Sequence, residues 1–523
     1  MDKKKRLITM VVTLLVLTIG VTFAYFMART GEGKQAGTTI TTGTVDDLKF
    51  NVSKENLSLN INQFNFASGS GNLSDNVTAT ASLKANSTKN TATYNYYVYF
   101  QIKSNDYVYT TTDKKPEIVL SITGPNGEIT SVDGLTYVSA TNADGTVVKG
   151  FDITESKPSF IKIADSYEIS SSSSTNYTNQ EWTFTVTFIN LDTNQVDNQN
   201  KNLTGKVLIQ QDKILSLAEY VVSQYTGTQG ENNIYFHDSK LTNGAGDNSY
   251  RFAGASDQVN NYVCFGSNVT PCPADNLYRI IGVFGNNVKL IKYDYGTTDE
   301  LGTDGDYYKT YKEWGMGSTY KGTYGDGERI GVYYWNKSTQ KNTWSESLLN
   351  KTNLNTNFIN NIGDDWANKI DMTTWKVGGN TWANIANQPA KTAYQNEIVS
   401  PVTTNSQDNK TEYSAKIGLM YVSDYMYAAP QDKWTLVGNN SDASKDYRAA
   451  ISVNWMYMGL YEWTISRRAD SSSFAFYVYY TGDVGYNYVG RFTFGVRPVF
   501  NLSSSVKFSS GDGTSSNPIR LEL

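Results

Sequence analysis

Near its C-terminus the chain alternates two sets of side chains at the period of two that is typical of a β-strand. One set consists of every second residue: Phe474, Phe476, Val478 and Tyr480. The other set lies between them: Ala475, Tyr477 and Tyr479. Residues 481–483, Thr-Gly-Asp, predict a turn, and a second aromatic stretch over 484–494 predicts a returning strand. This pattern constrains the end of the chain to a hairpin.

Only the core-facing side of such a hairpin must be apolar. Tyrosines on the other side supply rigid, amphipathic contact area at low entropy cost, which recognition surfaces favour. The residues predicted to contact a ligand are Tyr477, Tyr479, Tyr486 and Tyr488. The ending therefore predicts a binding surface rather than a catalytic centre.

Residues 463–502, which include Gly-Val-Arg-Pro-Val at 495–499, resemble the C-terminal part of bacterial C-type-lectin-like domains. That fold class includes formylglycine-generating enzymes and the hypervariable binding proteins that retroelements diversify. Residues 249–254, 261–266 and 276–284 resemble an uncharacterised surface-protein module of Gram-positive bacteria. The resemblance covers roughly the second half of the chain. It implies a lectin-like α+β domain over 234–523, with Trp455 and Trp463 in the core and Arg497 paired to a carboxylate.

The N-terminus indicates export. Residues 3–6 are Lys-Lys-Lys-Arg, and they precede an uncharged run over 7–26. This run fits a removable signal peptide, with Thr-Phe-Ala at 22–24 before the cut, and it is also long enough for an uncleaved membrane anchor over 1–26. Residues 20–26 resemble the signal region of TasA and camelysin-type secreted fibre proteins. The protein is therefore expected outside the cell, secreted or on the cell surface, with either fate of the leader open.

A separate domain is predicted over 43–211. Its opening residues, 43–50, resemble the start of the TasA-type mature domain. Strand-like segments then follow without helices between them, at 93–103, 117–123, 135–138, 159–163, 180–190 and 204–210. The clearest is the alternation of Trp182, Phe184, Val186 and Phe188 with threonines. Several short strands in succession predict a β-sandwich of jelly-roll or immunoglobulin-like type.

A change of period marks the boundary at 212–233. Apolar residues recur at spacings of three and four over 213–225, which predicts an amphipathic helix, and a glycine-bearing linker follows. In the second domain, residues 277–284 and 287–293 flank Gly285-Asn286 as a predicted hairpin. A helical middle follows, and 417–423 predicts a strand. The chain is thus expected to be mostly β, with a β-sandwich before an α+β lectin-like part.

Composition and cysteines support an extracellular class. The 38 tyrosines and 42 glycines favour strands and turns. A formal charge of −5 without a long basic run after the leader argues against a nucleic-acid partner. The two cysteines, Cys264 and Cys272, are expected to form a disulfide in an exported chain.

The search for catalytic chemistry is mostly negative. The one histidine, His237, has no evident nucleophile beside it, so a structural role is expected. The active-site cysteine pair of formylglycine-generating enzymes has no counterpart near the C-terminal end, so that activity is not carried over. Three carboxylates beside aromatic residues are the candidates for a glycosidase: Glu397, Asp424 and Glu462. The prediction is that the protein is not an enzyme.

No cofactor or metal site is predicted, although calcium stays open at two oxygen-rich turns, 304–306 and 512–514. The first functional hypothesis is an adhesin whose C-terminal domain binds a host or bacterial surface protein or glycan. The alternative is a structural fibre or biofilm-matrix subunit of TasA type that self-assembles by strand addition. A carbohydrate-active enzyme is the third hypothesis. If the leader is uncleaved, the membrane is a further partner.

Overall fold

The computed structural model describes residues 46–62, 73–314, 319–401 and 412–522. It is mostly strand, arranged in several antiparallel sheets, as the sequence predicts. The chain divides into two compact units, one ending at Ile214 and one beginning at Leu215. The leader, including the expected signal peptide or anchor over 1–26, lies outside the described residues. Among the described residues, no helix combines the length and the apolar character needed to cross a membrane.

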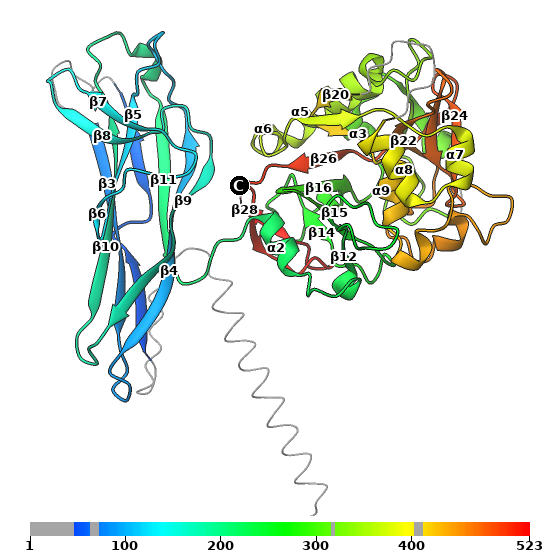
Figure 1. Ribbon diagram of the computed structural model, residues 1–523. Helices are drawn as coiled ribbons and strands as arrows, with labels where there is room; N and C mark the ends of the chain where they lie inside the picture. Colours follow the sequence, from blue (N-terminus) through cyan, green and yellow to red (C-terminus); the bar gives the residue numbers. More distant parts are fainter. Residues whose placement is uncertain (1–45, 63–72, 315–318, 402–411, 523) are drawn as a thin grey trace, which may run out of the picture. The chain divides into compact units, whose positions relative to one another are not determined.

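The first unit consists of two antiparallel sheets (Figure 1). The larger sheet has the strand order β1 (Asp47–Val52), β3 (Leu73–Lys84), β10 (Thr178–Phe188), β5 (Ile118–Gly124), β8 (Val147–Asp152) and β7 (Tyr137–Thr141), with β6 (Gly127–Glu128) paired to β5. The smaller sheet has the order β2 (Leu57–Asn60), β11 (Asn202–Gln210), β4 (Ala92–Asn105) and β9 (Ser159–Ser171). Each strand-like segment that the sequence predicts here overlaps one of these strands.

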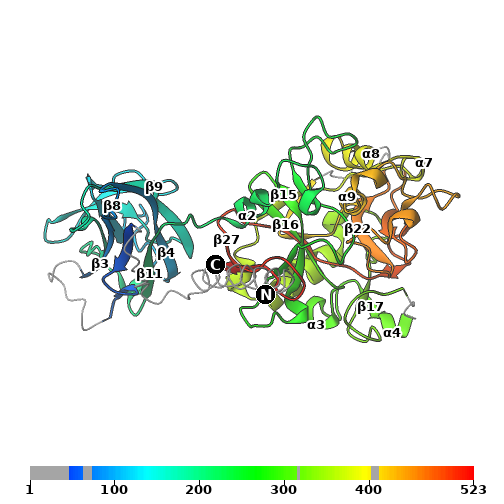
Figure 2. The ribbon, with the colours of Figure 1, turned by 90° about the horizontal axis from the view of Figure 1, so that it is seen from below.

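Alternate residues of the two sheets form one apolar core. The ring of Phe184 on β10 stacks on that of Phe100 on β4, with centroids 6.0 Å apart. The indole nitrogen of Trp182 donates a hydrogen bond of 2.9 Å to the Tyr96 hydroxyl. The sheets therefore face each other as two layers, which Figure 2 views along the strands. Trp182 and Phe184 of β10 therefore both face this core, as the period-two alternation predicts.

The second unit is built around a sheet with the order β12 (Ile234–Phe236), β13 (Tyr250–Phe252), β15 (Leu277–Phe284), β16 (Asn287–Lys292), β26 (Val499–Leu502) and β21 (Ile417–Gly418), with β14 (Tyr262–Cys264) paired to β15. The hairpin predicted around Gly285-Asn286 is confirmed: β15 and β16 pair from Phe284 and Asn287. Gly285 has a φ of 62°, a value that glycine adopts without strain.

Smaller sheets complete this unit. A three-stranded sheet contains β17 (Tyr307–Thr310), β18 (Gly331–Tyr334) and β25 (Thr493–Phe494). Another contains β22 (Glu462–Arg467), β23 (Phe474–Val478) and β24 (Val484–Tyr488). Two strand pairs are β19 (Thr373–Lys376) with β20 (Glu412–Ala415) and β27 (Lys507–Ser510) with β28 (Arg520–Glu522). The predicted C-terminal hairpin is β23 and β24.

The described helices are short. The α-helices are α2 (Leu217–Ser223), α3 (Thr298–Leu301), α4 (Tyr311–Trp314), α5 (Ile359–Ile362), α6 (Asp364–Ala367), α7 (Trp382–Asn387), α8 (Ala390–Tyr394) and α9 (Val422–Tyr427). Two π-helical segments are Leu349–Phe358 and Gln395–Val399. The 3₁₀ turns are Val196–Asn198, Glu231–Asn233, Ala274–Asn276, Trp344–Glu346, Gln431–Lys433 and Tyr447–Ala450.

Two predicted elements have different bounds in the structure. The helix expected over 213–225 is shorter, because the Leu215 carbonyl accepts a hydrogen bond from Phe508 before Ser216 caps α2. The strand expected over 417–423 ends at Gly418, and α9 begins at Val422. There the Asp424 carboxylate accepts the Tyr421 N–H at 3.0 Å, which favours a helix start over a strand.

Candidate functional site

The register of the β23–β24 hairpin decides which tyrosines share a face. Tyr477 lies opposite Gly485, whereas Phe474 lies opposite Tyr488 and Phe476 opposite Tyr486. Because directly opposed residues of an antiparallel pair point to the same side, Tyr486 and Tyr488 lie on one face. Tyr477 lies on the other, and so does Tyr479 two residues later. The four predicted contact tyrosines therefore belong to two different faces.

The face with Tyr477 is buried, so the prediction that Tyr477 is an exposed ligand contact is wrong. Its side chain is 1% exposed. Its ring lies 4.4 Å from the Phe494 ring and 5.9 Å from that of Trp463, measured between centroids. Burial raises the pKa of the Tyr477 hydroxyl far above its ordinary value. Tyr479 is half-buried and packs against Tyr477 and Tyr461.

The opposite face opens toward solvent at one end. Near the turn, Val478 and Val484 are buried, and the Val484 N–H donates to the Gly438 carbonyl. At the other end, Tyr488 is 38% exposed, and Phe474 and Tyr486 are half-buried. Helix α7 adds Trp382, whose ring lies 4.7 Å from that of Tyr486. We call these four residues, Trp382, Phe474, Tyr486 and Tyr488, the aromatic face.

An arginine holds the rings of the aromatic face in place. The Arg468 guanidinium lies 4.1 Å from the Tyr486 ring centroid and 5.0 Å from that of Phe474. Its Nε and Nη2 atoms donate to the two oxygens of Asp470 at 2.9 and 2.8 Å. This bidentate pair fixes the plane of the guanidinium, and the stacked rings gain cation–π attraction. The result is a pre-organised surface of flat rings with a charged rim.

Trp382 and Arg468 were not among the predicted site residues. Trp382 opens α7 directly after its cap, where the Thr381 hydroxyl accepts the Asn384 N–H at 3.1 Å. No local pattern relates residue 382 to the hairpin 90 positions later. The available signal was the pair Arg467-Arg468 next to an aromatic strand, a setting that suits cation–π contact.

The residues expected to be structural are all buried in the second unit. Trp455 and Trp463 are 1% and 0% exposed. Arg497 is buried, and its Nε donates to the Glu462 carboxylate at 2.8 Å. His237 is buried, and its Nδ1 accepts the Ala245 N–H at 3.1 Å. Burial lowers the pKa of His237 well below its ordinary value, and nearby Arg251 adds to this effect, so the imidazole is neutral near pH 7.

The three carboxylates considered for catalysis are all buried. Glu462 pairs with Arg497, and Asp424 contacts the Lys289 ammonium at 2.5 Å. Glu397 accepts hydrogen bonds from the Ser466 hydroxyl at 2.5 Å and the Ser423 N–H at 3.0 Å. Burial raises the pKa of Glu397 to about 7. Each carboxylate is thus bonded within the fold, and none belongs to the aromatic face.

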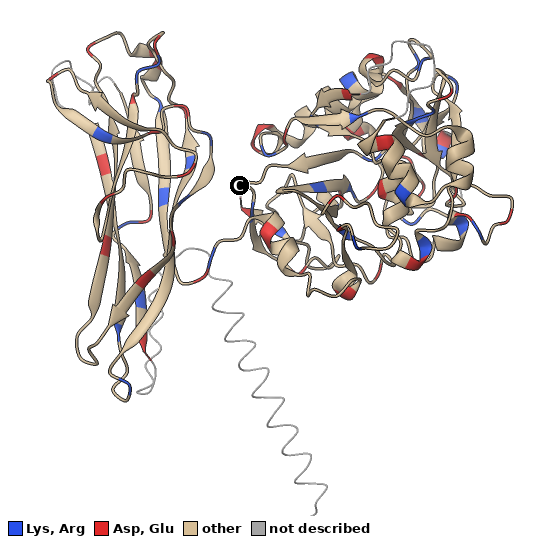
Figure 3. Ribbon diagram, viewed as in Figure 1, with Lys and Arg blue, Asp and Glu red and all other residues tan. Residues whose placement is uncertain are grey.

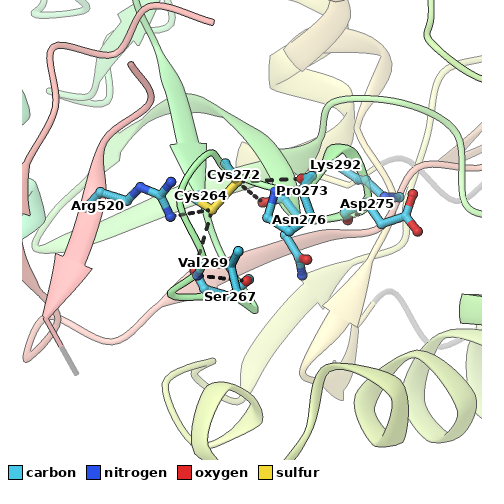
Figure 4. The surroundings of a disulfide bond; sticks show 9 residues. All are labelled: Cys264, Ser267, Val269, Cys272, Pro273, Asp275, Asn276, Lys292 and Arg520. Atoms are coloured by element: carbon cyan, nitrogen blue, oxygen red, sulfur yellow. Dashed lines mark hydrogen bonds between the residues drawn. A yellow bond between two sulfur atoms is a disulfide. The ribbon is translucent and has the colours of Figure 1, made fainter. Parts of the chain in front are cut away.

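The predicted disulfide is confirmed. Cys264 and Cys272 are joined, with their Cα atoms 5.8 Å apart (Figure 4). The Cys264 sulfur accepts a hydrogen bond of 3.1 Å from the Arg520 guanidinium on β28. The bridge therefore lies where β14 and the C-terminal strand meet, away from the hairpin in sequence and structure.

The turns considered for calcium use their oxygens within the protein. Asp306 accepts the N–H groups of Lys337 and Leu349 at 2.9 and 2.7 Å. Asp304 accepts from the Asn357 amide, and Asp512 from Thr514. In the part of the chain that the structure describes, no group of three or more His, Cys, Asp or Glu side chains is placed to hold a metal ion.

Two hollows are lined by residues other than those of the aromatic face. One, of about 350 Å³, is lined by α2, β13 and the C-terminal region, with polar residues that include Gln224, Asn232 and Gln258. The other, of about 440 Å³, lies in the first unit beside β2 and the start of β3. Lys, Arg, Asp and Glu residues are interspersed along the ribbons of both units (Figure 3).

Comparisons with protein-family models, with curated proteins and with solved structures gave no match to this chain.

Proposed function

We propose that the protein is an extracellular cell-surface binding protein whose second unit recognises a protein or a glycan through the aromatic face. The observation that carries this proposal is the cluster of partly exposed rings, Trp382, Phe474, Tyr486 and Tyr488, held by the Arg468–Asp470 pair. Such rings offer large contact area and lose little entropy on binding, since neighbours already fix them.

The export signal at the N-terminus supports an extracellular setting, either secreted or anchored at the surface of a Gram-positive-type cell. The disulfide between Cys264 and Cys272 agrees with an oxidising compartment. The lectin-like resemblance of the second half points in the same direction. The proposed ligand surface keeps Tyr486 and Tyr488 and adds Trp382 and Phe474. It leaves out Tyr477 and Tyr479, which lie on the other face of the hairpin.

The test is an array of glycans and surface proteins probed with the purified protein and with a Tyr486→Ala/Tyr488→Ala variant. Tyr308→Ala is the matched control, because Tyr308 is a 51% exposed tyrosine of the same unit outside the aromatic face. Binding that is lost only in the double variant, with an unchanged melting temperature of the second unit, is expected. Binding that survives in the double variant would place recognition elsewhere.

A second candidate is the fibre subunit, and a feature of β3 favours it. Strand β1 pairs with only Ala79–Lys84 of β3. On that side, residues 73–77 have no strand partner among the described residues, and the 440 Å³ hollow lies beside them. An added strand can satisfy such an open edge. Asp75, which contacts Lys54 on this edge, restrains unspecific pairing.

Light scattering and electron microscopy of two purified forms test this candidate. If the segment before β1 is the added strand, protein that begins at Tyr25 forms fibres as its concentration rises, and protein that begins at Asp47 stays monomeric. Monomers of both forms would remove the fibre hypothesis.

A further inference from the structure

A lysine and an aspartate lie in direct contact inside the second unit. Lys289 is on β16, a central strand of the large sheet, and Asp424 is in the first turn of α9. The Lys289 Nζ atom lies 2.5 Å from Asp424 Oδ2. The two side chains are only 8% and 3% exposed. Amine and carboxyl are therefore held together out of reach of bulk water.

Aromatic rings enclose this contact. Lys289 Nζ lies 4.7 Å from the centroid of the Tyr421 ring, 5.5 Å from that of Phe284 and 5.8 Å from that of Trp375. In such surroundings an ammonium group loses its hydration, which disfavours the charged form of the Lys289 amine. Burial accordingly lowers the pKa of the Lys289 ammonium. An uncharged amine is the form that can act as a nucleophile.

A second carboxyl stands beside the pair. Glu397 is fully buried, and its Oε2 accepts the N–H of Ser423, the residue before Asp424. Its other oxygen accepts from the Ser466 hydroxyl, so its hydrogen-bond partners include no cation. Burial raises the pKa of Glu397 to about 7, so the group can both hold and release a proton at neutral pH.

The other charges of the cluster balance one another. Arg251 pairs with Asp247 at 2.6 Å, and the Tyr394 hydroxyl donates to the same carboxylate. Arg251 also lies 3.9 Å from Asp424 Oδ1, where it stabilises negative charge on that carboxyl. If Lys289 and Asp424 both become neutral and Glu397 is protonated, one cation and one anion remain. A covalent link between the pair thus leaves no unpaired charge among these five side chains.

We propose that Lys289 and Asp424 are joined by an intramolecular amide bond. The Lys289 Nζ–Asp424 Cγ bond forms, and one C–O bond of the Asp424 carboxyl breaks. The departing oxygen leaves as water with two protons from the ammonium, so the step needs no oxidant, reductant or activating co-reactant. Glu397 relays a proton from the amine to the leaving oxygen. The bond links β16 to α9 and closes the chain between residues 289 and 424.

Mass spectrometry of the reduced, denatured protein tests this proposal. The wild-type chain is expected to be lighter than its sequence mass by one water, relative to a Lys289→Met variant after correction for the substitution. The Lys289→Met variant cannot form the bond whether or not it folds. A misfolded variant therefore still gives the mass of the unlinked chain. Equal corrected masses would overturn the proposal.

A proteolytic digest locates the lost water. The expected product is one branched peptide that contains both Lys289 and Asp424, and this peptide is absent from the Lys289→Met digest. Water loss confined to another site, such as a succinimide at an Asp-Gly or Asn-Gly sequence, overturns the proposal equally. Glu397→Gln is expected to form the bond at least tenfold more slowly during refolding; an unchanged rate removes the relay role of Glu397.

Discussion

The two units differ most in how they treat buried charge. Within the described residues, the first unit buries one charged side chain, Glu117. Its carboxylate accepts from the Gln195 and Asn198 amides and from Thr110. The buried charged residues of the second unit are Arg251, Arg279, Lys289, Lys292, Asp294, Glu300, Asp306, Lys369, Glu397, Asp424, Asp446, Glu462, Arg467, Asp483 and Arg497.

This difference shows two ways of specifying a core. In the first unit, the alternation along each strand decides which residues face inward. Burial of these apolar side chains then supplies most of the stabilisation of the core. In the second unit, the elements are short and joined by long connections, so the alternation within an element does not specify which elements pack together. Directional pairs such as Arg497–Glu462 join segments that periodicity cannot relate. Such pairs add little net stability but penalise wrong arrangements strongly.

The largest effect is expected when one partner of a buried ion pair in the second unit is removed. Glu462→Ala leaves the Arg497 guanidinium buried without its carboxylate, and is expected to destabilise the second unit by about 3 to 5 kcal/mol. Urea unfolding followed by tryptophan fluorescence measures the loss. The double variant Glu462→Leu/Arg497→Met is the control and should recover most of it. A loss below about 1 kcal/mol in the single variant contradicts the role given to this pair.

The next test uses pH. The pKa of Glu397 is raised from 4.5 to about 7 in the folded protein, so the folded state holds this proton more tightly than the unfolded state. The resulting stability is complete below pH 4.5 and is lost as pH rises through 7, a change of about 3 kcal/mol. Glu397→Gln should remove this part of the pH dependence in the second unit. Identical stability-against-pH curves for the two proteins would contradict the buried, protonated state.

A smaller effect is expected in the core of the first unit. Ile122 on β5 is 1% exposed, and Ile122→Val removes one methylene group from the apolar core. The expected cost is about 1 kcal/mol in the free energy of unfolding of the first unit alone. Differential scanning calorimetry that resolves two transitions checks this. A shift of the second transition instead would show that the units do not unfold separately.

The smallest effect is expected at the surface of the first unit. Lys162 and Asp165 form a 2.5 Å pair on the edge strand β9, and both side chains are more than 40% exposed. Lys162→Ala should change the free energy of unfolding by less than about 1 kcal/mol, and even less at high salt. A loss as large as that of Glu462→Ala would remove the contrast between surface and buried pairs.

The two units also differ in how well their elements and faces can be predicted from the sequence. Strands β10 and β11 of the first unit could be located because each carries its own alternation and needs no distant partner to decide its faces. The hairpin of β23 and β24 could be located for the same reason. Its exposed side could not, because α7 and Trp463 decide what covers each face, and both come from outside the hairpin.

Helix starts show the same limit. The start of α2 depends on Phe508 binding the Leu215 carbonyl from almost 300 residues away. Likewise, the contacts that bury Glu397 and Asp424 involve Ser466 and Lys289, which no local spacing relates. Trp382 likewise belongs to the aromatic face only through its contact with Tyr486, which lies far along the chain. Periodicity therefore predicts elements, whereas long-range pairs decide faces and sites.

The most direct test of the recognition surface is the dissociation constant of Trp382→Ala for the strongest ligand from the array, measured by titration calorimetry beside wild type and Tyr308→Ala. Trp382 is suited to this because it belongs to the aromatic face but not to the hairpin itself. Binding by Trp382→Ala is expected to be at least tenfold weaker, about 1.4 kcal/mol or more, and binding by Tyr308→Ala is expected to be unchanged. Equal dissociation constants for all three proteins would contradict this expectation.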